Sequence, residues 1–566
     1  MCSQSNSSNS IRSNIRGHRC IVSVRHHTSP CTLFGYWYLA QHDHAFLLLW
    51  HPETVHLEAL TVAGHSMSIA SHSLSLLHSQ MFEFARHNVD SSRYFRSRGL
   101  AHVVSVAPEI PTILKDRNVL ELPDGNDLFL QLKPSSIHVV PGDIDTNRFC
   151  NALSKTLGRF PHAAGRLQRN GDDWKINLTN SSVPVTVTED TDRDEVIPTE
   201  HRHRVVHGDL QAFQVPVSLE GAIMGEDVPL VTFKLTKMKK TGETVLGISW
   251  NHVLGDATTL TNLLQTLSQY YQGLPPPPAP TFYRRRWPRP PEGAEGGALY
   301  QRYTPHVAKS YPLADVVAKY VAEAQAASMV DFKFTAANLD ALRKRASRWT
   351  PDDAWHSGES LKLTHQDSLT AYLITLHNRC LDKPIHGLMN MMSYRTRAAD
   401  ENALYRHPGN AANCVYLPTF DLSSSPTLSA LARTIRRGIV NARSTEYVEK
   451  YLMLNSAAQQ DAAKYGKFHI FPGESVALVN SLMGHRRAQM VHFGFPGKSQ
   501  YYTEISWERM FRVFPANPVK GADGNWEDNT GSVVVAFRVK NELKDKMAAM
   551  FHEDMSRLEK GLELDD

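Results

Sequence analysis

The stretch Ser249-Trp250-Asn251-His252-Val253-Leu254-Gly255-Asp256 stands between two segments of different periodicity. Before it, residues 230–238 and 244–250 are rich in residues that favour strands and flank Lys240-Thr241-Gly242, a pattern that predicts a β-hairpin. After it, apolar residues recur at helical spacing and stop at Gly273. The stretch is therefore predicted to be the turn between a strand and an amphipathic helix.

This turn contains His252 and Asp256 in a His-x-x-x-Asp pattern. Histidine has an ordinary pKa of about 6.5, so His252 could serve as a general base near neutral pH. The alternative is an ordinary core histidine without a catalytic role. Asp256 is interpreted either as a carboxylate that organises the turn or as the N-cap of the following helix. We expect no hydrogen bond between His252 and Asp256, because four residues of irregular turn separate them.

The composition is that of a large globular protein. Of the 566 residues, 42% are hydrophobic and 21% are charged, which provides enough apolar material for large cores. The net charge of +4 is too small for its length to predict a nucleic-acid or membrane-surface partner. The six cysteines lie far apart and predict neither a disulfide framework nor a metal site, and no apolar run approaches the roughly 20 residues of a membrane span. We expect a cytoplasmic monomer without a bound metal.

The chain divides by composition into four parts. Residues 1–100 contain no lysine and eleven of the 28 histidines, and we expect an irregular or disordered extension there. Residues 101–272 are expected to form an N-terminal lobe with the His-x-x-x-Asp pattern, and 273–330 a proline-rich crossover linker. Its basic run before Trp287 is interpreted as solvated linker rather than a nucleic-acid contact. Residues 331–566 are expected to form a C-terminal lobe.

Strands and helices alternate on both sides of the linker, which predicts an α/β protein of two lobes. The helices expected outside the His252 region lie in 149–160, 332–346 (after a short strand) and 368–380, with a last one at the end of the chain. The further strands expected are 102–106, 183–187, 388–393, 475–479, 490–495, 501–506 and 532–539.

Five segments together, in this order, resemble BAHD-type acyltransferases of the fungal branch. The resemblance covers about residue 101 to the end of the chain. Besides Asn251-His252-Val253-Leu254-Gly255-Asp256, the segments are Ala152 to Leu167, Gln366 to Leu373, Tyr394-Arg395-Thr396-Arg397 and Gly409-Asn410-Ala411.

The resemblance implies a two-lobed chloramphenicol-acetyltransferase-like fold with a channel between the lobes. Acyl-CoA would enter as co-substrate, with no bound cofactor, and a small-molecule alcohol or amine of secondary metabolism would accept the acyl group. His252 would remove the acceptor's proton as the acceptor attacks the thioester, without a covalent enzyme intermediate. Asp256 would support the site by turning toward an arginine, Arg395 first and Arg397 second. The residues that bind the CoA phosphates stay unassigned, because no glycine-rich phosphate loop is present.

The family's second signature, Asp-Phe-Gly-Trp-Gly, corresponds here to His492-Phe493-Gly494-Phe495-Pro496. Gly494 is expected to support the site through the fold, and His492 to replace a structural carboxylate in a strand. The altered signature keeps a second hypothesis open, a catalytically inactive homologue that binds CoA or a metabolite. A third hypothesis is a condensation-type domain that uses carrier-protein thioesters, although such domains carry two adjacent histidines where this chain has Asn251 and His252.

Overall fold

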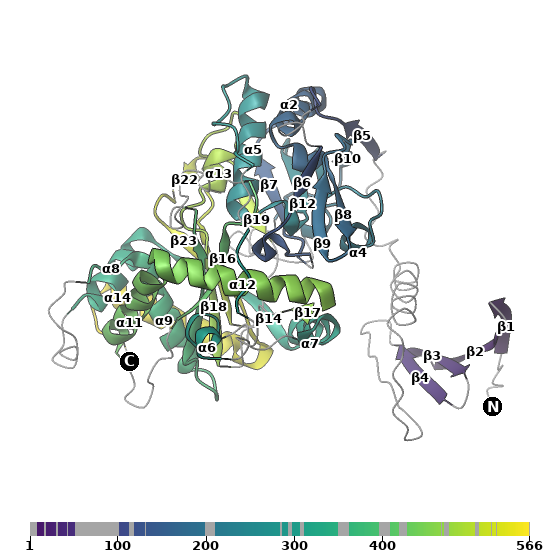
Figure 1. The fold of residues 1–566 in the computed structure, drawn as a ribbon. Coiled ribbons are helices and arrows are strands. Elements are labelled where there is room, and N and C mark those ends of the chain that lie inside the picture. Colours follow the sequence, from purple (N-terminus) through teal and green to yellow (C-terminus); the bar gives the residue numbers. More distant parts are fainter. Residues whose placement is uncertain are drawn as a thin grey trace. The chain divides into compact units, whose positions relative to one another are not determined.

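Figure 1 shows the fold of the protein in a computed structural model. The contacts within the chain divide it into two units, Met1–Arg96 and Ser97–Asp566, and each is described by itself. The structure describes four strands within residues 8–50 and residues 101–564 except for 112–117, 131, 198–209, 283–285, 292–296, 306–310, 349–360, 396–407, 418–426, 466, 469–474, 504–508, 522 and 528.

The first unit contains a four-stranded antiparallel sheet in the order β1-β2-β3-β4. Its strands are Ser8–Ile15, His18–Ser29, Thr32–Gln41 and His44–Trp50. An irregular or disordered extension is expected from the sequence over 1–100, and the structure differs from that expectation in these four strands. The aromatic and aliphatic residues of β3 and β4 favour extended backbone, which the weak alternation of the segment concealed. Residues 51–100 lie outside the described part of the chain.

The second unit contains two six-stranded sheets, each covered by helices. The first sheet has the order β19-β7-β12-β11-β10-β5, and all of its pairings are antiparallel except that of β10 with β11. Helices α2 and α5 pack on each other and share a core with this sheet (Figure 1). The elements are β5 His102–Val106, β7 Ser135–Val140, α2 Thr146–Arg159, β10 Val183–Asp190, β11 Val231–Met238, β12 Thr244–Trp250, α5 Ala257–Gln272 and β19 Gln500–Thr503.

Smaller elements complete this half of the unit. A three-stranded sheet has the order β6-β9-β8, and the remaining elements are short helical turns. These elements are β6 Val119–Glu121, η2 Gly125–Asp127, η3 Pro161–Ala164, β8 Arg166–Asn170, β9 Asp173–Asn177, α4 Leu219–Ile223 and η5 His252–Leu254.

The predicted hairpin and the helix after it are confirmed. Strands β11 and β12 pair with Val231 opposite Trp250, and the helix α5 follows the turn. Gly273 ends α5 with a φ of 74°, a left-handed conformation that glycine adopts without a steric penalty. The position of the turn between β12 and α5 is therefore determined at both sides by regular structure.

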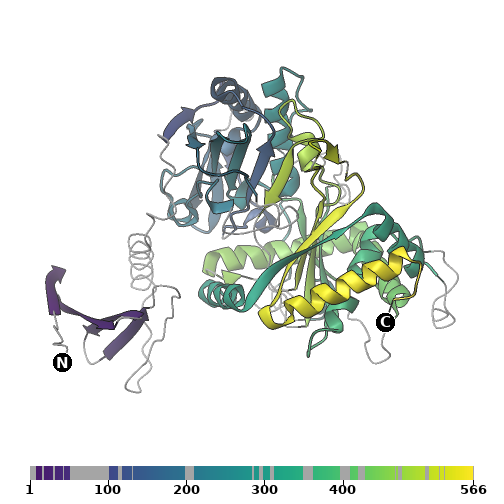
Figure 2. The ribbon, with the colours of Figure 1, turned by 180° about the vertical axis from the view of Figure 1, so that it is seen from behind.

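The second sheet has the order β14-β23-β20-β18-β15-β16. Helices α8, α9, α11 and α14 share one hydrophobic core with it. The C-terminal helix α14, yellow in Figure 2, packs against β14, α8 and α9. The main elements are β14 Ala327–Phe334, α8 Ala336–Ala346, α9 His365–Asn378, β15 Gly387–Ser393, β16 Ala412–Leu417, α11 Leu428–Ala442, α12 Thr445–Tyr465, β18 Val476–Ser481, β20 Met510–Pro515, β23 Val533–Lys540 and α14 Lys544–Glu559.

The expected C-terminal lobe, residues 331–566, is not a continuous structural part. Strand β19, within the segment 487–503, pairs with β7 as an edge of the first sheet. Val491 and Phe493 of the same segment are buried in the core of the first sheet. The strand expected at 490–495 is wrong, because the short helix α13, Arg487–Met490, and a turn occupy this stretch. Its apolar residues anchor a turn rather than alternate along a strand.

The expected linker, 273–330, is more regular than its prolines suggest. It contains α6 Ala298–Tyr303, α7 Leu313–Ala326 and the start of β14. The sequence of α7 has neither proline nor glycine and is rich in good helix formers, which explains the helix. The segment expected as a proline-rich crossover linker thus contains regular elements.

Candidate active site

His252 lies in the turn between β12 and α5, at the first position of the 3-10 helix His252–Leu254. Asn251 caps this short helix with its side chain. The main-chain N–H of His252 donates a hydrogen bond of 3.0 Å to the carbonyl of Leu132, just before β7. Gly255 then turns the chain into α5 with a φ of 143°, in a region that favours glycine. Two neighbouring strands and a helix thus hold the backbone of His252.

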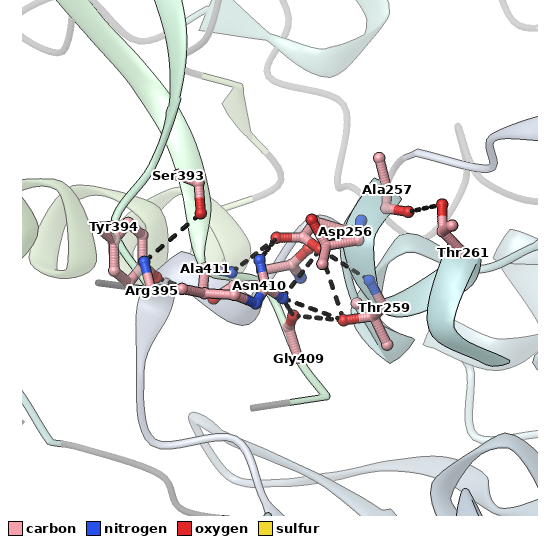
Figure 3. Close-up of polar contacts among 12 residues, drawn as sticks. Asp256, Ala257, Thr259, Thr261, Ser393, Tyr394, Arg395, Gly409, Asn410 and Ala411 are labelled. Atoms are coloured by element: carbon pink, nitrogen blue, oxygen red, sulfur yellow. Dashed lines mark hydrogen bonds and ion pairs between the residues drawn. The ribbon is translucent and has the colours of Figure 1, made fainter. Parts of the chain in front are cut away.

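Asp256 caps α5 and pairs with Arg395 (Figure 3). Its Oδ1 accepts from the main-chain N–H of Thr259, and its Oδ2 accepts from the main-chain N–H of Ala411 at 3.1 Å. Arg395 donates from Nη1 to Oδ2 at 2.6 Å and from Nη2 to Oδ1 at 3.0 Å. Burial raises the pKa of Asp256, but the charge and hydrogen bonds of Arg395 outweigh it and hold that pKa below the ordinary value. Both interpretations of Asp256, turn organiser and N-cap, therefore apply.

The pair joins the two halves of the site. Asp256 begins α5, whereas Arg395 follows β15 of the second sheet. Both side chains are 6% exposed, so the two charges meet in an environment that excludes most water. Arg395 is thus placed where the sequence expected the partner of Asp256. Its alternative, Arg397, lies outside the described residues.

Asn410 connects the second half of the unit directly to His252. Its side-chain Nδ2 donates a hydrogen bond of 2.9 Å to the main-chain carbonyl of His252. Its main-chain N–H donates to Oδ1 of Asp127 at 2.9 Å, and Nδ2 also donates to the carbonyl of Asp127. Asn410 is 1% exposed, so these hydrogen bonds are made away from water. Asn410 therefore bridges two turns of the first half of the unit.

Asp127 belongs to a buried acidic pair with Asp124. Burial and the charge of Asp127 raise the pKa of Asp124 to about 7. The indole Nε1 of Trp287 donates a hydrogen bond of 2.9 Å to Oδ2 of Asp124. Trp287, which the sequence analysis assigned to solvated linker, is therefore fixed against the turn that Asn410 also contacts. Of the three arginines just before it, Arg286 lies 4.0 Å from a carboxylate oxygen of Glu121, and Arg284 and Arg285 lie outside the described part of the chain.

The imidazole of His252 lies against an aromatic ring in a largely dry environment. Its ring centroid is 4.9 Å from that of Phe129. Nδ1 is fully buried, which leaves Nε2 as the ring nitrogen that can meet a substrate. Burial lowers the pKa of His252 below its ordinary value of 6.5, although its own main-chain carbonyl, Asp256 and Asn410 act in the opposite direction. The imidazole is accordingly neutral near pH 7 and can accept a proton.

The second signature lies away from the His252 turn. Phe493 donates from its main-chain N–H to Oγ of Ser268, twelve residues along α5 from Asp256, or about 18 Å of helix. Gly494 has a φ of 101° and lies in an exposed turn, where its N–H donates to Nδ1 of His492. The structure therefore does not bring Gly494 together with His252. The expectation that His492 lies in a strand is wrong, because it caps this turn.

Asn410 and Phe129 are not predicted as site residues from the sequence. Asn410 belongs to Gly409-Asn410-Ala411, which enters only as one segment of the family resemblance. A polar residue next to glycine in a loop is a weak signal, and its contact with His252 spans 158 residues of sequence. Phe129 follows the turn-forming Asp124-Gly125-Asn126-Asp127, which marks a turn but not its neighbour in space.

The model of one protein family, described as the Transferase family, matches residues 138–469, more than half of the chain. The chain belongs to this family. It is the BAHD-type family of acyl-transferring enzymes, so the resemblance, the two-lobed α/β fold class and the enzyme prediction are confirmed. The assignment to a fungal branch stays a prediction.

Several solved structures have the same fold as this chain, although their sequence identity to it is low. Vinorine synthase is 14% identical, with a TM-score of 0.53, over 80% of this chain and 96% of that one. TRI101 of F. sporotrichioides, in complex with coenzyme A and T-2, is 16% identical, with a TM-score of 0.52, over 76% of this chain and 97% of that one. TRI101 of F. graminearum, in complex with coenzyme A and deoxynivalenol, is 17% identical, with a TM-score of 0.52 and the same coverage.

No curated protein sequence matches this member of the Transferase family. Among the helices that the structure describes, none has the length and apolar character needed to cross a membrane.

Proposed function

We propose that this enzyme transfers an acyl group from acyl-CoA to a hydroxyl or amine of a small-molecule acceptor in secondary metabolism. His252 is the general base. The observation that carries the proposal is the half-buried imidazole of His252, whose backbone is fixed by hydrogen bonds with Leu132 and Asn410 and whose pKa is lowered by burial. The complexes of TRI101 with coenzyme A and a small-molecule toxin support the same two classes of substrate.

In the proposed reaction, Nε2 of His252 accepts the proton of the acceptor as its oxygen or nitrogen attacks the thioester carbonyl. The tetrahedral intermediate then collapses and expels the CoA thiolate, which takes the proton from protonated His252 to become free thiol and so restores the base. The donor is already activated, so a base and correct alignment are the main requirements. The acyl-CoA and the acceptor would reach His252 through a channel between the two lobes.

Asp256, Arg395 and Asn410 act through the backbone in this proposal. The Asp256–Arg395 pair fixes the start of α5, and Asn410 fixes the carbonyl of His252. Such constraints matter because a misplacement of about 1 Å can cost about a hundredfold in rate. Gly494 supports the fold at the other end of α5 and does not contact the reacting groups.

The proposal is tested by the release of free CoA thiol from a panel of acyl-CoAs with a panel of hydroxyl- and amine-bearing acceptors. We expect His252→Ala to abolish thiol release and to keep the circular dichroism spectrum and the binding of acyl-CoA. His386→Ala is the matched control, because His386 is an exposed histidine outside the site. Unchanged turnover in His252→Ala would overturn the role of the base.

The same assay separates the alternatives. Binding of acyl-CoA without turnover on the whole panel would favour an inactive homologue. Turnover with an acyl group on a carrier protein, and none with the same acyl-CoA, would favour a condensation-type domain. Turnover with acyl-CoA excludes both.

A further inference from the structure

A second buried cation lies near the start of α5. The side chain of Arg487, from α13, is buried among residues of the first half of the unit. Its Nε donates to Oγ1 of Thr261 at 2.8 Å, its Nη2 donates to the carbonyl of Ala257 at 2.9 Å, and its Nη1 donates to the hydroxyl of Tyr501. All three acceptors are neutral oxygens.

No carboxylate pairs with Arg487 among the residues that the structure describes. The carboxylate at the start of the same helix, Asp256, is engaged by both Nη atoms of Arg395. A guanidinium has five N–H groups, so Arg487 has two left, one on each Nη. Buried charges in proteins are usually paired, because an unpaired one loses its hydration without compensation.

Two further polar side chains lie close to this cation. Ser136 and His138 lie two residues apart on β7 and therefore share a face of the strand. The His138 ring centroid is 5.1 Å from that of Tyr501, and the guanidinium carbon of Arg487 is 4.8 Å from the same Tyr501 centroid. Both side chains are at most 2% exposed. Oγ of Ser136 and both ring nitrogens of His138 have no hydrogen-bond partner within the described ranges.

Among the described residues, the ionisable groups around Arg487 do not neutralise its positive charge. Burial, followed by the charge of Arg487, lowers the pKa of His138 to about 3, so this ring is neutral. The same two causes lower the pKa of His485 to about 4, with Asp256 acting in the opposite direction and Arg395 in the same direction. The cluster thus has one positive charge and several unused hydrogen-bonding groups.

We propose that Arg487, His138 and Ser136 bind a carboxylate group carried by one of the enzyme's substrates. A carboxylate brings one negative charge, and it can accept the two remaining N–H groups of Arg487 together. A phosphate carries more charge than this single buried cation can neutralise. His485, whose main-chain carbonyl accepts from the N–H of Arg487 at 2.7 Å, is only half-buried, so we expect the ligand to enter from its side.

The inference rests on the proposed acyl transfer, and it adds that one of the two substrates carries a free carboxylate. The carboxylate can come from the acyl donor, as in the CoA thioester of a dicarboxylic acid, or from the acceptor, as in a hydroxy acid. Both sources present the same group, and experiment distinguishes them.

The first arm measures the equilibrium binding of malonyl-CoA and acetyl-CoA to the full chain by calorimetry. The second arm measures the binding of a panel of hydroxy acids and their methyl esters in the presence of saturating CoA. In one of the arms we expect the free carboxylate to bind about tenfold or more tighter than its uncharged counterpart. Arg487→Gln should remove that preference, because glutamine keeps polar contacts without the charge.

The control is Arg486→Gln, which removes the charge of the exposed neighbouring arginine and should leave the preference unchanged. Ser136→Ala is the second variant, chosen because it changes the core least. Ser136→Ala should weaken carboxylate binding by severalfold, and it provides the test in case Arg487→Gln does not fold.

Equal binding of charged and uncharged ligands in both arms, with acetyl-CoA bound, would overturn the carboxylate site and leave the proposed acyl transfer intact. A preference that survives Arg487→Gln would also overturn it. Failure of every acyl-CoA to bind would instead contradict the proposed function, and the inference would fall with it.

Discussion

The side-chain amide of Asn410 donates a hydrogen bond of 2.9 Å to the main-chain carbonyl of His252. Asn410 comes just before β16 of the second sheet, and His252 follows β12 of the first. The hydrogen bond therefore crosses between the two halves of the unit and ends on the residue proposed as the base. It provides a way to test how far the backbone of His252 determines activity.

Asn410→Ala should lower kcat more than it raises KM for acyl-CoA. The variant removes the donor to His252 and lets the turn shift, which should cost about tenfold to a hundredfold in kcat. The free energy of unfolding should fall by about 1–3 kcal/mol, because the buried carbonyls lose their partner. Steady-state kinetics and denaturant unfolding measure the two effects. Asn151→Ala, an exposed change on α2, is the control, and an unaltered kcat in Asn410→Ala would refute the role.

The Asp256–Arg395 pair should show strong energetic coupling. Arg395→Met leaves the buried Asp256 carboxylate unpaired and should cost about 3–5 kcal/mol of unfolding free energy. Asp256→Asn keeps an oxygen for the cap of α5 but leaves Arg395 unpaired. The double variant should cost less than the sum of the two by roughly 1–3 kcal/mol, as measured by denaturant unfolding. Strict additivity would show that the two charges do not stabilise each other.

The pH dependence of activity follows from the burial of His252. Its pKa lies below 6.5 in the folded protein, so the neutral base persists at pH values where an exposed histidine is already protonated. The acid limb of kcat/KM should therefore lie below pH 6.5. A profile of kcat/KM between pH 5 and about 8 measures it, with unfolding checked at each pH. An acid limb above 6.5 is the opposite of this expectation.

The stability of the protein should fall on the acid side for a related reason. Burial lowers the pKa of His377 to about 4 in the folded state, against an ordinary value of 6.5. Between these values the unfolded chain binds the extra proton, so the free energy of unfolding falls as pH drops from about 6.5 toward 4. His377→Gln should make this fall shallower in denaturant titrations. His552→Gln, at an exposed histidine, should leave the slope unchanged, and equal slopes in all three proteins would contradict the assignment.

The sequence predicted the parts of the site that are determined locally. The hairpin, the turn with His252, and α5 with its caps at Asp256 and Gly273 follow from periodicity and capping chemistry within some 45 residues. Arg395 was expected as the partner of Asp256 from the family resemblance, and in the structure the two side chains form an ion pair. These elements can be predicted from the sequence because strand alternation, helical spacing and capping depend on residues that are close together in the chain.

The remaining features depend on contacts between distant segments. Nothing periodic near Asn410 indicates His252, because their hydrogen bond depends on how the two sheets meet. The apolar residues of 490–495 look like a strand, yet Phe493 serves as an anchor in the core beside α5. The burial of Arg487 is also not evident from the sequence, because a sequence does not show which arginine is buried.

The pairing of β19 with β7 has a consequence for folding during translation. During synthesis, β5, β7, β10, β11 and β12 leave the ribosome long before residues 500–503. Until then, β7 presents an uncovered edge, and exposed edges invite pairing with other chains. A chain shortened before residue 500 would carry this open edge permanently. The first sheet therefore depends on the last tenth or so of translation, although most of its strands are made in the first half.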